Sequence, residues 1–418
     1  MSATTTAPDA VQAPPEATLG QSWRDYVARV RGGDLGALPS VLALVTLVII
    51  FTVLKGDRFF TSFNFANLIT QSATIIVLAM GLIYVLLLGE IDLSAGFAAG
   101  TSAAVLAVTL TQKGLPLAVC LVATLATGVA IGLFNGVIVA KLGIPSFVVT
   151  LAMFLALQGL MLIIIGDGGT IPVRDDFIKA LMNSNLSPLA GWILYAVVVL
   201  GYVLTTFRTM ESRRRAGLVA QSRQVWLAKA LALAVLLGIA VFILNGERSR
   251  NAAVSIQGVP YVVIIIVALL VGLTYQLNRT SFGRHVYAVV GNAEAARRAG
   301  INVASIRIAC FIACSTLAAV AGILFASKDQ SVSPSTGGST TLLYAVGAAV
   351  IGGTLLFGGR GKIRDAILGG LVVAVIGNGL PLITDASGIQ FMVTGLVLLV
   401  AASVDALSRR RAQASGRA

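Results

Sequence analysis

GRHVYAVVGNAEAARRAGINV, residues 283–303, is a polar and charged island between two long apolar stretches. Within it, Glu294, Ala295 and Ala296 are followed by Gly300, a spacing that predicts a short helix ended by a glycine in the left-handed conformation. Such a helix is small on one side and basic on the other, which suits docking into a groove on a soluble partner. The island is therefore the first candidate for a functional segment.

The remainder of the chain has the composition of a membrane protein. Hydrophobic residues make up 57% of it, charged residues only 11%, and the mean hydropathy is +0.92, which excludes a soluble globular domain. Because one span takes about 20 apolar residues, the sequence predicts an all-α polytopic membrane protein with roughly 10 to 12 transmembrane helices. The apolar stretches lie near residues 38–54, 72–88, 95–111, 115–140, 144–165, 188–207, 225–244, 259–277, 305–327, 341–358, 365–383 and 390–407.

The net charge of +13 comes from basic clusters at the ends of these stretches, so membrane topology explains it better than a nucleic-acid partner does. A twelve-span count places all five clusters on one side, which the positive-inside rule makes cytoplasmic together with both chain ends. We expect a multi-pass membrane protein. One loop, 245–258, fits poorly because Arg248 and Arg250 fall on the outer side. The five clusters are Arg24, Arg29 and Arg31; Arg213, Arg214 and Arg215; Arg279, Arg284, Arg297 and Arg298; Arg360, Lys362 and Arg364; and Arg409, Arg410 and Arg411.

Three regions follow from this pattern. Residues 1–36 are expected to form a partly disordered cytoplasmic tail, because they are rich in Ala, Thr and Pro and lack the apolar core of a cleaved signal. Residues 37–407 form the transmembrane domain, with the cytoplasmic loop 278–304 inside it. Residues 408–418 form a basic cytoplasmic tail.

The residue types needed for catalysis or metal binding are scarce. Cys120, Cys310 and Cys314 lie inside apolar stretches and are interpreted as small core residues, and the single histidine, His285, has no partners for a metal site or a triad. The stretch 358–363, GGRGKI, lacks the first glycine of a phosphate-binding loop and has isoleucine where serine or threonine should hold magnesium. We expect no catalytic residue, no metal and no cofactor on this chain.

Two carboxylates interrupt the apolar part between residues 88 and 96. Glu90 and Asp92 lie a few residues apart, with Ser94 following, and a carboxylate placed centrally in a membrane costs about 2.5 to 3.5 kcal/mol. One interpretation is a broken helix that lines a translocation pathway. The other is that Asp92 and Ser94 are only caps of the helix that starts near Ala95. Both interpretations stay open, and both can hold at once.

Uncharged polar residues gather near the start of the fifth predicted span. Pro145 occupies the first turn, where its missing N–H costs nothing, and polar groups around it offer donors and acceptors suited to a neutral polyol. Taken singly, each is more often a hydrogen bond between helices. The predicted pathway residues are Glu90, Asp92, Ser94, Asn135, Pro145, Ser146, Phe147, Thr150, Gln158 and Asn378.

A weak internal repeat supports a transporter. Asn135-Gly136 followed by IPSFVVT at 144–150 resembles Asn378-Gly379 followed by GIQFMVT at 388–394. In the twelve-span count the two copies have opposite orientation, as many transporters arrange the repeats that enclose their pathway. Gly128, Gly132 and Gly136 recur every fourth residue, a spacing that allows close helix packing.

Several motifs together resemble the sugar-transporting branch of ABC importer permeases, the ribose, xylose and galactose group, over about residues 40–407. The Glu294-Ala295-Ala296-x3-Gly300 segment resembles the EAA coupling loop of that family. Glu90, where many relatives have glycine, and the extra span after residues 213–215 resemble the xylose-transporting members. The other motifs are EIDLS at 90–94, PSFVVTLA at 145–152, GINV at 300–303 and VIGGT at 350–354.

The resemblance implies the fold of a BtuC-like type II importer permease that moves a monosaccharide, D-xylose or a related pentose. It implies a homodimer of permeases in the lipid bilayer, separate ATPase subunits that bind ATP and Mg, and a periplasmic sugar-binding protein. The residues it assigns to ATPase coupling are Gly291, Asn292, Glu294, Ala295, Ala296, Arg297 and Gly300.

One departure concerns two acids. Relatives commonly carry Glu-Leu-Asp before the IGGT segment, where this chain has Leu342, Leu343 and Tyr344, which puts the exact sugar in doubt. A proton-coupled sugar carrier, with Glu90 and Asp92 as the titrating pair, is the alternative function. A membrane scaffold would explain the spans but not the polar helix starts.

Overall fold

The computed structural model describes residues 38–166, 169–218, 221–249, 255–356 and 358–414, together with Gly20, Arg24 and Val27. The tail expected over residues 1–36 lies almost entirely outside the described residues, as does Arg250. Within the described part, the chain is helical apart from one pair of two-residue strands, β1 (Ile171–Pro172) and β2 (Ser331–Val332), which pair antiparallel.

The helices match the twelve predicted apolar stretches one to one. Ten are long and apolar enough to cross a membrane, and α14 and α16 each contain a shorter apolar helix. The chain is therefore an all-α, multi-pass membrane protein. The ten candidate membrane helices are α2 (Leu38–Phe59), α3 (Ser62–Leu87), α4 (Ala95–Ala107) with its π-helical extension η1 (Val108–Gln112), α5 (Leu117–Leu142), α6 (Ser146–Ile165), α8 (Pro188–Arg215), α9 (Arg223–Asn245), α10 (Val262–Arg279), α13 (Val303–Asp329) and α15 (Ile363–Ile383); the two helices with shorter apolar stretches are α14 (Gly338–Ile351) and α16 (Ser387–Ala414).

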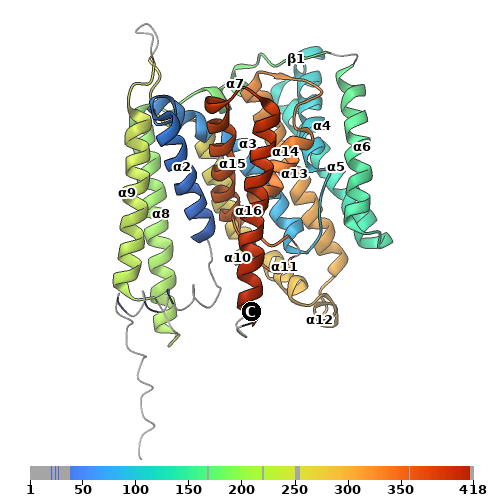
Figure 1. Cartoon of the computed structure of the whole chain (residues 1–418). Coiled ribbons are helices and arrows are strands. Elements are labelled where there is room, and N and C mark those ends of the chain that lie inside the picture. The colour runs from blue at the N-terminus through green and yellow to red at the C-terminus, as the bar shows by residue number, and fades with distance from the viewer. Residues whose placement is uncertain are drawn as a thin grey trace, which may run out of the picture.

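Three short helices lie at the two ends of the bundle (Figure 1). Helices α11 (Ser281–Gly291) and α12 (Ala293–Arg298) lie at what we call the lower end, and α7 (Asp176–Asn183) lies with β1 at the upper end. The α5–α6 connection is at the lower end and the α15–α16 connection at the upper end. The two copies of the internal repeat therefore run in opposite directions, as the sequence predicts.

The basic clusters gather at the lower end. Helix α8 ends there with residues 213–215, α12 carries Arg297 and Arg298, and α16 ends there as well (Figure 1). The cluster at 360–364 joins them because the Tyr287 hydroxyl of α11 donates to the Gly361 carbonyl at 3.4 Å. Four of the five clusters therefore share one end of the bundle, as the twelve-span count predicts.

Helices α3, α4 and α13 form the centre of the bundle and are its three most buried helices. Helix α13 packs against α5 through the glycine row predicted for close packing. A Cβ at Gly136 would lie 2.8 Å from the Ile308 Cα, and one at Gly128 or Gly132 would overlap the α13 backbone in the same way. These glycines therefore set the α5–α13 separation, which is the packing role that their spacing indicates.

Three helix ends differ from the sequence prediction. Helix α3 begins at Ser62, ten residues before the predicted stretch, because polar side chains hide its first turns. Asn64 and Asn378 exchange hydrogen bonds of 2.8 and 2.9 Å there. Helix α14 ends at Ile351 and not near 358, because Gly352 packs against the Asp365 carbonyl of α15. Helix α16 continues to Ala414, beyond the boundary expected at 407.

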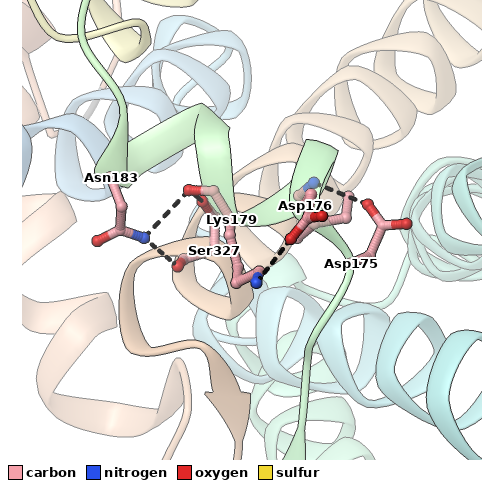
Figure 2. Close-up of polar contacts among 6 residues, drawn as sticks. Asp175, Asp176, Lys179, Asn183 and Ser327 are labelled. Atoms are coloured by element: carbon pink, nitrogen blue, oxygen red, sulfur yellow. Dashed lines mark hydrogen bonds and ion pairs between the residues drawn. The ribbon is translucent and has the colours of Figure 1, made fainter.

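Helix α7 caps the upper end of α13, a feature absent from the sequence prediction (Figure 2). Asp175 accepts from the Ile178 N–H at 3.0 Å and so caps the helix start, and Lys179 pairs with Asp176 at 2.8 Å. Ser327 of α13 accepts from the Met182 N–H at 3.0 Å, and its carbonyl accepts from the Asn183 amide at 2.7 Å. The upper end of α13 is thus fixed to α7.

The arginine that fits the positive-inside rule poorly has a structural task. Arg248 is buried, and its guanidinium donates to the carbonyls of Leu244 at 2.6 Å and Gly258 at 3.0 Å. It therefore joins the end of α9 to the chain before α10. Because the Arg248 guanidinium is buried and hydrogen-bonded within the protein, its position is not evidence for which side of the membrane this loop faces.

Glu247 organises the same connection and predicts a pH effect. Its exposed carboxylate accepts from the Ser255 hydroxyl, the Ile256 and Ser249 N–H groups and the Gln257 amide, which lowers its pKa below the ordinary 4.5. A carboxylate whose pKa is lower in the folded than in the unfolded chain stabilises the fold above the unfolded-state pKa of 4.5. This stabilisation is lost as the pH falls from 4.5 through the folded-state pKa. The melting temperature of the wild-type protein in detergent should therefore be lower at about pH 3 than at about pH 6. The fall in melting temperature should be smaller in Glu247→Gln. An equal fall in the two proteins would contradict the stabilising role of the Glu247 carboxylate.

Candidate functional site

Helix α3 ends in a turn that breaks the chain before α4. Gly89 has a positive φ of 74° and donates its N–H to the Leu86 carbonyl at 2.9 Å, while the Glu90 N–H donates to the Val85 carbonyl at 3.1 Å. This pair of bonds is a Schellman motif, which satisfies the last carbonyls of a helix. Residues 88–94 therefore form a defined break between two buried helices, as the broken-helix interpretation predicts.

The break is held by the first turn of α6. The Ile91 N–H donates to the Ser146 hydroxyl at 3.1 Å, and the Thr150 hydroxyl donates to the Ile91 carbonyl at 3.0 Å. Both polar groups of one backbone unit are thus satisfied by side chains one helical turn apart. Pro145 is the residue before the helix, so it ends the lower connection and does not interrupt α6.

Asp92 lies three residues before the first residue of α4 and is completely buried. Its Oδ1 accepts from the Ser94 N–H at 2.9 Å and from the Ser94 hydroxyl at 2.6 Å. Asn135 of α5 donates to the same hydroxyl at 2.9 Å. Ser94 is the N-cap residue of α4, yet its side chain makes no cap hydrogen bond. Asp92 holds the turn before the helix through these two bonds to Ser94, and its Oδ2 has no hydrogen-bond partner among the described residues. Ser94 instead joins the break to α5.

The predicted pathway residues therefore separate into three places. Six of them meet around the break, and five of these six are buried. Phe147 and Gln158 lie on α6 with their side chains exposed. Asn378 lies at the upper end, paired with Asn64 and Gln71. Their contact with a substrate stays a prediction. The six that meet are Glu90, Asp92, Ser94, Asn135, Ser146 and Thr150.

The glycine-rich stretch at 358–363 packs against the same break. The Gly359 N–H donates to the Leu87 carbonyl at 3.2 Å, and a Cβ at Gly358 would lie 2.8 Å from the Gly89 nitrogen. Its Gly361 carbonyl meets Tyr287 of α11. The glycines are thus explained by close approach of two backbones, and the segment connects the lower-end helices to the end of α3.

The island at 283–303 contains most of α11, which the sequence does not predict, and then α12, the short helix that the spacing of Glu294 and Gly300 predicts. Asn292 caps α12 by accepting from the Ala295 N–H at 2.9 Å. At the other end, Gly300 has a φ of 85°, its N–H donates to the Arg297 carbonyl at 3.0 Å, and the Ile301 N–H donates to the Ala296 carbonyl at 3.0 Å. Helix α12 therefore ends in a second Schellman motif, and α13 begins at Val303.

Helix α12 presents a charged surface at the lower end. Glu294 pairs with Arg297 at 3.1 Å and Arg298 at 3.4 Å, and all three side chains are more than half exposed. Ala296 is buried and anchors the helix to the bundle. The predicted coupling residues that remain exposed are Gly291, Asn292, Glu294, Ala295, Arg297 and Gly300.

A family model described as "Branched-chain amino acid transport system / permease component" matches residues 64–402. The match runs from the start of α3 into α16 and includes both the break and α12. The chain belongs to this permease family. No solved structure matches it.

Curated members of the permease family match almost the whole chain. The xylose transport system permease protein XylH of Escherichia coli K12 is 32% identical over 378 residues, which covers 90% of this chain and 93% of that protein. XylH of Haemophilus influenzae is 32% identical over 383 residues, covering 92% and 99%. The ribose import permease protein RbsC of Escherichia coli K12 is 30% identical over 366 residues, covering 88% and 92%.

The two acids that this chain lacks would occupy different surroundings in the permease fold. Leu342 is buried, and its Cβ would lie 3.0 Å from a Cβ on Gly96 at the start of α4. Leu343 is exposed and Tyr344 is half-buried. An acid at 342 would therefore be buried against α4, whereas an acid at 344 would be only half-buried.

Proposed function

We propose that the chain is the permease subunit of an ATP-driven importer that moves a monosaccharide, D-xylose or a related pentose, across the bacterial inner membrane by alternating access. Membership of the permease family supports transport, and the xylose and ribose relatives support a pentose. The single observation that carries the ATP-driven part is α12, an exposed and charged helix at the end where the basic clusters gather.

The proposal assigns a side of the membrane to each end of the bundle. The lower end faces the cytoplasm, because four basic clusters lie there. ATPase subunits, which bind ATP and Mg, dock on α12 and its neighbours. A sugar-loaded binding protein docks at the upper end, near α7, and a second copy of the chain completes the pathway. Both chain ends are cytoplasmic in this arrangement.

The carrier alternative needs two titrating carboxylates in the pathway. Glu90 is instead ion-paired with Arg307 at 3.5 Å, and the Oδ1 of Asp92 accepts two hydrogen bonds from Ser94. These contacts engage the Glu90 carboxylate and one oxygen of Asp92, whereas the Asp92 Oδ2 has no hydrogen-bond partner among the described residues. They favour an energy source outside this chain over a proton relay within it.

ATP hydrolysis by the assembled complex tests the proposal. The purified permease and ATPase, reconstituted in liposomes, would be presented with binding protein loaded in turn with D-xylose, D-ribose, L-arabinose, D-galactose or no sugar. Hydrolysis stimulated most by the xylose-loaded or another pentose-loaded protein would support the assignment. Equal hydrolysis with every sugar and with the empty protein would contradict it.

A further inference from the structure

A single ion pair joins the lower end of α13 to the α3–α4 break. The Nε of Arg307 lies 3.5 Å from the Glu90 carboxylate, with side-chain exposures of 34% and 15%. The two residues are 217 positions apart in the chain. Because both charges are largely removed from water, each side chain is constrained by the other.

Arg307 is rigidly connected to α12. Gly300 ends α12, and Asn302 caps α13 by accepting from the Ser305 N–H at 3.0 Å. Arg307 then lies in the second turn of α13. Only the short capped turn between these helices separates Arg307 from α12, the surface proposed to bind the ATPase. A displacement of α12 is therefore expected to displace Arg307 as well.

Glu90 is rigidly connected to α6. Its own N–H is bonded into the end of α3, and the next residue, Ile91, is held through both backbone groups by Ser146 and Thr150. A force on the Glu90 carboxylate therefore acts on the break and on the first turn of α6. That turn leads directly to the exposed α6 residues Phe147 and Gln158.

We propose that the Glu90–Arg307 ion pair transmits the movement of α12 to the α3–α4 break and the first turn of α6. Glu90 and Arg307 are then positioning residues for the transport cycle, and neither contacts the sugar in this role. The inference rests on the proposed function, because it takes α12 as the helix that the ATPase moves. A continuous series of described contacts connects α12 to α6 through Asn302, Arg307, Glu90 and Ile91.

The test is the double variant Glu90→Ala with Arg307→Ala, in the complete complex with ATPase and binding protein. It removes the pair without leaving one charge buried alone, so folding should survive where a single variant fails. We expect the melting temperature to stay within a few degrees of wild type and ATP hydrolysis to continue, while sugar uptake per ATP falls by about tenfold. The exchanged pair, Glu90→Arg with Arg307→Glu, should recover part of that loss.

A matched control removes an ion pair from the same end of the bundle but away from this route. Glu211 and Arg215 of α8 lie 3.5 Å apart, and Glu211→Ala with Arg215→Ala should leave uptake per ATP unchanged. Normal uptake per ATP in the Glu90 and Arg307 double variant would overturn the inference, and so would an equal loss in the α8 control. Absence of ATP-driven uptake in wild type would instead contradict the proposed function itself.

Discussion

Replacing Gly369 by alanine should prevent α14 and α15 from packing and sharply reduce the amount of folded protein. Any Cβ at this position would overlap the Ala348 carbonyl oxygen of α14, and a backbone atom cannot rotate away as a side chain can. Overpacking of this kind typically costs about 1 to 3 kcal/mol, and more where the backbone must move. The measurement is thermal unfolding in detergent, together with the yield of monodisperse protein.

Gly377 provides the matched control on the same helix. A Cβ there would meet nothing within 4 Å, so Gly377→Ala should fold as wild type does or slightly better, since alanine is the stronger helix former. Equal melting temperatures and yields for the two variants would contradict the close approach of α14 and α15.

Replacing Gly300 by valine should uncouple ATP hydrolysis from sugar uptake while the protein remains inserted in the membrane. The positive φ of 85° is unfavourable for a β-branched residue, so the Schellman motif that ends α12 should open and α12 should lose its fixed position relative to α13. No atom lies within 4 Å of a Cβ at Gly300, so the effect comes from backbone conformation and not from a clash. Uptake per ATP in reconstituted complex should fall by about tenfold or more.

Gly217 allows the strain to be separated from the coupling. It ends α8 with a φ of 67°, its N–H donates to the Arg214 carbonyl, and the Leu218 N–H donates to the Arg213 carbonyl, which is the motif that ends α12. It too has no atom within 4 Å of a Cβ. Gly217→Val should therefore lose similar stability and keep normal uptake per ATP. Equal uncoupling by both variants would show that general destabilisation is the cause.

The apolar pattern was sufficient to locate every membrane helix, because each needs a long stretch of side chains that tolerate lipid. The apolar pattern did not locate the start of a helix where polar side chains hydrogen-bond to one another inside the bundle. The first turns of α3 contain Asn64 and Gln71, whose partner, Asn378, is some 300 residues away in the sequence. The apolar pattern did not locate α7, because its eight residues are too few to span a membrane.

The sequence identified the residues of the candidate site, but it did not determine the structural role of each one. The spacing of Glu294, Ala295, Ala296 and Gly300 identified α12 and the glycine that ends it, because these depend on neighbours in sequence. Whether Asp92, Ser94 and Asn135 line a pathway or brace a broken helix depends on which way buried side chains turn, and sequence spacing does not contain that information. Arg307 went unnoticed for the same reason, since only the folded chain brings it to Glu90.

If this permease uses the energy of an ATPase outside its own chain, sugar uptake into liposomes will depend on that ATPase. The measurement compares the complete complex, supplied with ATP and loaded binding protein, with the chain alone under an imposed proton gradient. We expect uptake that requires ATP, the ATPase and the binding protein together. Accumulation of sugar by the chain alone under the proton gradient would contradict this expectation.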